Sequence, residues 1–185
     1  MLIRSIFAPL ALAASVALAG PAAAQDDTAP APRVVNGQTF GSWTVQCEAI
    51  AVNETACVLS QRLVRGSDGA FLAELLAFSN ADGSQRYLAA RVPVGVHFPS
   101  GFAVRPAEAE GDDEQTDFVW QSCSRELCEA LLDLAPEALQ ALEAAETLVG
   151  GYRPSLRAQP LVFRFSVAGL GEGLAALDAA GARAR

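Results

Sequence analysis

Four cysteines are the residues of this 185-residue chain whose type and spacing say most about chemistry. Nine residues separate Cys47 from Cys57, and four separate Cys123 from Cys128. Structural zinc sites usually carry two C-x2-C knuckles, and thioredoxin-like redox centres carry C-x-x-C at a helix start. Neither spacing occurs here. An even number of cysteines in an exported chain indicates disulfide bonds, which we therefore expect for all four.

His97 is the only histidine of the chain. A catalytic triad or a histidine metal site needs a network of partners, and one imidazole in an apolar segment is more often a packed or surface residue. We interpret the segment as a strand that carries His97 on the face opposite Val96 and Phe98. The sequence therefore assigns this histidine no catalytic role.

Two further motifs could in principle bind an ion or a phosphate. Residues 108–117 hold six carboxylates but lack the order of a calcium-binding loop, which favours a solvated hairpin tip. Gly169, Gly171 and Gly173 do not have the spacing of a phosphate-binding loop and fit a helix entry better. We predict no catalytic residue, no cofactor and no metal ligand, and hence no enzyme.

The N-terminus has the order of a secretory signal peptide. Arg4 precedes an uncharged apolar run over residues 5–19, and small residues precede Gln25. This run is shorter than the roughly 20 residues that a membrane-spanning helix requires. We expect a signal peptide over 1–24, a flexible leader over 25–38, one domain over 39–180 and a flexible tail over 181–185.

Charge and compartment limit the partners. Without Arg4 the chain keeps 12 arginines and 21 acidic residues, a net charge of −9, and it has no lysine. Such a balance repels phosphate backbones and anionic lipids, so we expect no nucleic-acid partner. The mature protein is expected in the periplasm, or secreted or at the cell surface, with no transmembrane segment. Its expected partner is an unknown protein or envelope component.

Short apolar blocks separated by turn-forming residues follow Phe40. This spacing predicts an antiparallel sandwich or barrel. The expected strands cover 43–47, 57–64, 71–78, 85–92, 102–104 and 118–123, with strand preferred over helix at 128–134 and a central strand at 160–167.

Helix is predicted only in the C-terminal third. Pro136 suits the first position of a helix whose apolar stripe includes Leu139 and Leu142, and Gly150-Gly151 is expected to end it. One or two further helical turns fit residues 171–180.

Two physical arguments oppose each other on how the cysteines pair. Loop-closure entropy favours distant partners, at roughly 4 to 5 kcal/mol against roughly 2 to 3 kcal/mol for each local loop. Strand geometry favours local pairs, because Cys47 ends one predicted strand and Cys57 opens the next, and Cys123 and Cys128 flank a tight polar turn. We give the geometry more weight and predict Cys47 with Cys57 and Cys123 with Cys128.

The order of several short motifs resembles the invasion-associated locus B family from Phe40 to about Leu177. The motifs are W-x3-C at 43–47, C-x-L-x-Q at 57–61, V-P-x-G-V at 92–96, C-x4-C at 123–128 and S-x-x-G-L at 166–170. In the last motif Leu170 replaces an aromatic residue of the family, and the family's common lysines are missing.

This resemblance implies a mainly β fold, an antiparallel β-sandwich of immunoglobulin-like architecture with one or two short C-terminal helices. It also implies an exported bacterial protein without known catalysis, whose founding members are associated with entry into host cells. We expect a non-enzymatic binding or accessory module of the cell envelope. The alternatives are a structural envelope protein without a discrete ligand and, from a different class, a small hydrolase.

Overall fold

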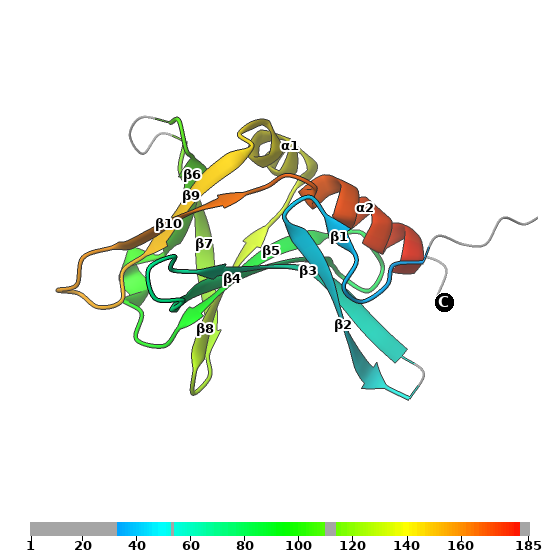
Figure 1. The fold of residues 1–185 in the computed structure, drawn as a ribbon, viewed down its shortest axis with the longest axis horizontal. Helices are drawn as coiled ribbons and strands as arrows, with labels where there is room; N and C mark the ends of the chain where they lie inside the picture. The colour runs from blue at the N-terminus through cyan, green and yellow to red at the C-terminus, as the bar shows by residue number, and fades with distance from the viewer. Residues whose placement is uncertain (1–32, 53, 110–113, 182–185) are drawn as a thin grey trace, which may run out of the picture. The chain divides into compact units, whose positions relative to one another are not determined.

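The computed structural model describes residues 33–52, 54–109 and 114–181, so the predicted signal peptide lies outside the described residues. The described chain forms ten strands, two α-helices and one 3-10 helix (Figure 1). The strands are β1 Thr39–Phe40, β2 Trp43–Ala51, β3 Glu54–Val64, β4 Phe71–Ser79, β5 Arg86–Pro93, β6 Phe102–Pro106, β7 Thr116–Cys123, β8 Leu127–Asp133, β9 Thr147–Tyr152 and β10 Leu161–Ser166. The helices are η1 Phe98–Ser100, α1 Pro136–Ala144 and α2 Leu170–Gly181.

All ten strands belong to one antiparallel sheet with the order β1-β2-β3-β4-β5-β8-β7-β6-β9-β10. The mainly β, antiparallel class and the two C-terminal helices are confirmed. The layers of the expected sandwich are parts of one continuous curved sheet, an arrangement compatible with a sandwich. The strand predicted as central at 160–167 is β10, which lies at one end of the sheet order.

Alternation along the strands builds the core. Trp43 and Val45 of β2 are fully buried, as are Leu75 and Ala77 of β4. The period of two places every second side chain on the inner face. Helix α2 covers the inner face of β1 to β4 with an apolar stripe of Leu170, Leu174 and Leu177.

The two ends of the sheet meet through backbone atoms at two glycines. Gly41 lies in the tight turn between β1 and β2, and Gly169 lies between β10 and α2. The Ser42 amide donates a hydrogen bond of 3.1 Å to the Ala168 carbonyl. A Cβ atom on Gly41 would lie 2.2 Å from that carbonyl oxygen, and one on Gly169 would lie 2.3 Å from the Phe40 carbonyl oxygen. Only residues without a side chain allow this approach.

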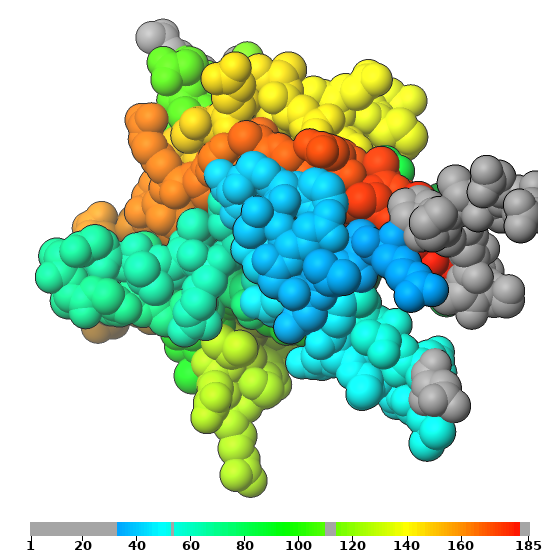
Figure 2. Space-filling model, turned by 45° about the vertical axis from the view of Figure 1, so that its right-hand side comes forward, coloured from blue at the N-terminus to red at the C-terminus, as the bar shows by residue number. Residues whose placement is uncertain are grey.

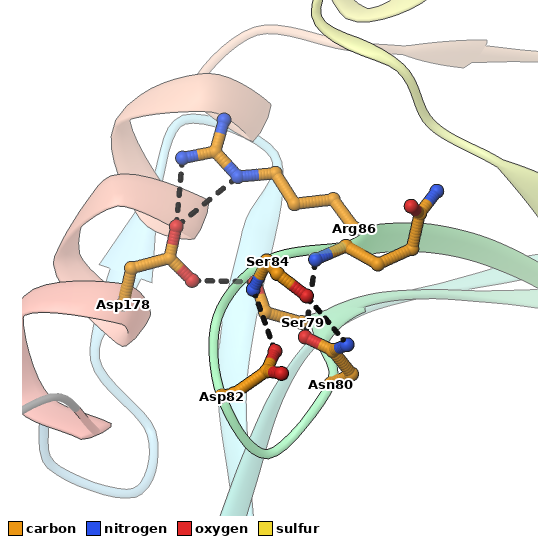
Figure 3. Close-up of polar contacts among 7 residues, drawn as sticks. Ser79, Asn80, Asp82, Ser84, Arg86 and Asp178 are labelled. Atoms are coloured by element: carbon orange, nitrogen blue, oxygen red, sulfur yellow. Dashed lines mark hydrogen bonds and ion pairs between the residues drawn. The ribbon is translucent and has the colours of Figure 1, made fainter.

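An ion pair fixes the far end of α2 to the turn between β4 and β5 (Figure 3). Arg86 donates hydrogen bonds of 2.7 and 3.1 Å to Asp178 Oδ2, and Ser79 Oγ donates to Asp178 Oδ1. Both partners of the pair are partly buried. Charge-assisted hydrogen bonds of this kind are about twice as strong as neutral ones, so they hold the helix in one orientation.

One local expectation needs correction. The Gly150-Gly151 pair does not end α1, which stops at Ala144, but lies within β9. A Cβ on Gly150 would lie 3.0 Å from the Phe163 ring, so this strand needs glycine for packing against β10. At the end of the predicted leader, Gly37 donates a hydrogen bond to the Val45 carbonyl and the Val45 amide donates to the Gln38 carbonyl.

Replacing Gly169 should therefore weaken the whole domain. We expect Gly169→Ala to lower the free energy of unfolding by more than about 3 kcal/mol, because positive φ costs about 1–2 kcal/mol and the clash with backbone adds to it. The matched control is Gly83→Ala, at a φ of 74° with no atom near the new Cβ, against 86° for Gly169. Urea denaturation measures both variants, and equal losses would contradict the role of the backbone contact.

Candidate functional site: two disulfide-stapled hairpins

The first hairpin with a predicted disulfide covers residues 47–57 and joins β2 to β3. Cys47 and Cys57 are direct partners in the strand register and form a disulfide with a Cα–Cα distance of 4.1 Å. The Cys47 amide donates a hydrogen bond of 3.0 Å to Oδ1 of Asn36, which lies in the segment before β1. The disulfide packs against the core and so marks the point where the hairpin leaves it.

Beyond this disulfide every described residue of the 47–57 hairpin is exposed. The apolar side chains Ile50 and Val52 are 60% and 93% exposed, and Ile50 lies at a register shift between β2 and β3. In Figure 2 this hairpin, in cyan, projects from the body of the domain. The arrangement presents apolar side chains to a partner on a held pair of strands.

The second hairpin, residues 123–128, joins β7 to β8. Cys123 and Cys128 are register partners and form the other disulfide, with a Cα–Cα distance of 3.9 Å. The turn is closed by Ser124, whose amide donates to the Leu127 carbonyl at 2.7 Å and whose Oγ accepts from the Leu127 amide at 3.1 Å. Its tip is polar and exposed, and it projects separately from the first hairpin (Figures 1 and 2). Both pairings are those that strand geometry predicts.

His97 lies in an irregular segment before η1 and not on a strand, so the predicted alternation with Val96 and Phe98 is wrong. The positive φ of Gly95, at 94°, ends the extended conformation, and Pro99 favours the 3-10 turn. His97 Nδ1 lies 2.7 Å from Ser100 Oγ, and the His97 amide donates to the Arg153 carbonyl. The imidazole thus closes its own turn.

The acidic and glycine-rich motifs also have local explanations. The acidic stretch forms the connection of the β6–β7 hairpin, and residues 110–113 of it are outside the described part of the chain. Gly169 precedes α2, and the Gly171 amide donates a hydrogen bond of 2.7 Å to Glu143 of α1. In the described ranges no group of three or more His, Cys, Asp or Glu side chains could hold a metal ion.

Sequence reasoning did not single out Ile50 and Val52. Their signal is present in the sequence, because an apolar stretch between two disulfide-bonded cysteines ten residues apart is too short to return to the core. Such residues must stay exposed at a hairpin tip.

Of the described helices, none is long and apolar enough to cross a membrane.

These features define a class of protein: a mainly antiparallel β domain with a C-terminal helix and two hairpins that carry local disulfides. The chain belongs to the invasion associated locus B (IalB) protein family, whose family model matches residues 43–178. The resemblance of the short motifs therefore identified the family correctly. The two disulfides indicate an oxidising, exported compartment.

Solved structures support the same fold. A crystal structure of invasion associated protein B from Bartonella henselae matches with a TM-score of 0.60 at 18% sequence identity. The match covers 76% of this chain and 92% of that chain. In a comparison with curated proteins, none matched this chain.

Removing a disulfide should destabilise its hairpin first. We expect Cys47→Ala with Cys57→Ala to lower the free energy of unfolding by about 2–3 kcal/mol, and Cys123→Ala with Cys128→Ala by about 2 kcal/mol, because each closes a short loop. Limited proteolysis should then cut the 47–57 hairpin in the first variant only.

Non-reducing peptide mapping of the native protein measures the cysteine pairing directly. A cross-link between the two hairpins, or free thiols, would contradict the pairing.

Proposed function

We propose that the mature chain is a non-enzymatic binding module of the bacterial cell envelope, in the periplasm or at the cell surface. The observation that carries the proposal is the 47–57 hairpin, with Ile50 and Val52 exposed beyond a disulfide. Large apolar side chains gathered at an exposed tip are typical of contact sites for other proteins. Family membership also favours a protein without catalysis.

The disulfide makes the hairpin suited to binding. An isolated two-stranded hairpin is marginally stable in water, so its tip would lose much conformational entropy on docking. The Cys47–Cys57 bond holds the strands in register before any partner arrives. The partner proposed here is a protein of the same envelope with an apolar surface that receives the tip. A host-cell protein would use the same contact chemistry.

Export requires that residues 1–24 act as a signal peptide, which we propose from their sequence. The exported protein should begin at Gln25 and carry the domain proposed over 39–180. Intact-mass measurement of protein purified from the periplasm or medium checks the start. Retention of residues 1–24, or a start beyond Asp27, would contradict the cleavage site.

The binding function is tested by capture from the native envelope. We expect the mature domain to retain a defined envelope protein, and Ile50→Ser with Val52→Ser to reduce the retained amount at least tenfold, because the tip loses its apolar contacts. The matched control is Val64→Ser, which removes an apolar side chain that is 50% exposed at the other end of β3. Its retention should equal that of the native domain.

Two outcomes would overturn this proposal. Equal retention by the native domain and the tip variant would show that the 47–57 hairpin is not the contact. Retention of no defined protein at all would favour a structural envelope protein without a discrete ligand.

A further inference from the structure

Arginines without an acidic partner gather on one side of this acidic protein. Of the ten described arginines, three form ion pairs with carboxylates and Arg62 lies over the Phe71 ring. The remaining six are Arg33, Arg105, Arg125, Arg153, Arg157 and Arg164. Four of these lie on β6, on β10 and in the connection between β9 and β10. Since the chain carries a net negative charge, such a local excess of cations needs an explanation.

The sheet register brings two of these side chains to the same outer face. Val149 of β9 pairs with Arg105 of β6 on one side and with Arg164 of β10 on the other. Adjacent strands lie about 4.8 Å apart, so the Cα atoms of the two arginines are about 10 Å apart. Arg105 donates a hydrogen bond to the Ala109 carbonyl, whereas Arg164 is exposed and has no hydrogen-bond or ion-pair partner within the described ranges. Their remaining donors are available to a ligand.

A hollow of about 280 Å³ lies beside this pair on the same face. In the next row of the register, Ala103, Gly151 and Val162 are neighbours, so the floor is formed largely by main chain. Arg105 and Arg153 line the hollow, and no acidic residue is among its lining side chains.

Exposed apolar side chains accompany the charge at and near the hollow. Val162, which is 59% exposed, lines it. Phe98 and Leu156, which are 52% and 69% exposed, lie in the two turns that contribute Ser100 and Arg153 to its lining. The two turns that carry Phe98 and Leu156 are joined by the hydrogen bond from the His97 amide to the Arg153 carbonyl. A phosphate-rich polymer would contact only the guanidinium groups of such a surface. A ligand that also carries apolar side chains would contact both the charged and the apolar parts.

We propose that this outer face of β6, β9 and β10 binds an extended acidic segment of a partner protein. Carboxylates of the segment pair with Arg105 and Arg164, and an apolar side chain between them lies over Val149. Guanidinium groups bind carboxylates with two parallel hydrogen bonds, which gives geometric selectivity as well as attraction. The net charge of −9 repels an acidic ligand at long range. Affinity therefore comes only from close contacts with the arginines, and these depend on the shape of the ligand.

This site lies on different strands from the 47–57 hairpin and does not depend on the proposed function. The test uses a fluorescein-labelled peptide of alternating glutamate and valine, with its glutamine counterpart as the control peptide. Fluorescence anisotropy with the purified mature protein should show binding of the glutamate peptide at least tenfold tighter than that of the glutamine peptide.

Variants of the arginines then locate the site. Arg105→Gln and Arg164→Gln should each weaken binding of the glutamate peptide about tenfold, the effect of one lost charge-assisted contact. Arg164→Gln is the more secure variant, because its side chain makes no hydrogen bond in the described structure, whereas Arg105 bonds to Ala109. Arg125→Gln is the matched control, an exposed arginine without a partner among the described residues, at the tip of the 123–128 hairpin. It should leave binding unchanged.

The outcomes separate this site from other anion binding. Absence of binding by the glutamate peptide overturns the proposal, as does equal weakening by Arg125→Gln. Tighter binding to heparin or to phosphatidylglycerol vesicles than to the peptide would also overturn it, in favour of a polyanion or membrane surface. None of these results depends on Ile50 or Val52, so failure here leaves the proposed hairpin contact standing, and the reverse also holds.

Discussion

The close backbone approach of Gly41 and Gly169 is the constraint on which the rest of the structure depends. The strand order puts the β1–β2 turn and β10 at opposite ends of a ten-stranded sheet, and this contact brings the ends together. An open sheet of that size would leave two long free edges and an uncovered inner face. Helix α2 starts at the same point, so the closure also directs its apolar stripe onto β1 to β4.

The closed sheet explains why both disulfides lie where they do. Strands β2 and β3 have nine and eleven residues, and their pairing continues past Val45 and Leu59, the last fully buried pair. Beyond the Cys47–Cys57 pair every described residue of the hairpin is exposed, so burial no longer holds the two strands together. A disulfide between register partners supplies the stability that burial cannot, and the β7–β8 hairpin uses the same solution. The hairpins thus project because their strands extend beyond the core.

Local patterns predicted the strands and the cysteine pairs because both depend on neighbouring residues. The alternation of apolar residues through Trp43 and Val45 indicates which face of the strand is buried. A short turn between two cysteines indicates that they pair with each other. The prediction that Gly150 ends a helix was wrong because the reason for glycine at this position is not local. A side chain there would collide with the Phe163 ring, which belongs to another strand. The segment 160–167 looked central because most of its residues are apolar. Phe163 and Phe165 are indeed buried, yet Val162 and Arg164, which alternate with them, are exposed, and the strand lies at the end of the sheet.

The basic face could not be found from the sequence for a related reason. Arg105 is far from Arg153 and Arg164 along the chain, and net charge averages all three against 21 acidic residues. Only the order β6-β9-β10 makes them neighbours. An acidic protein of this kind therefore presents two chemically different surfaces, an apolar tip where strands leave the core and a cationic face where the sheet ends, and the net charge describes neither.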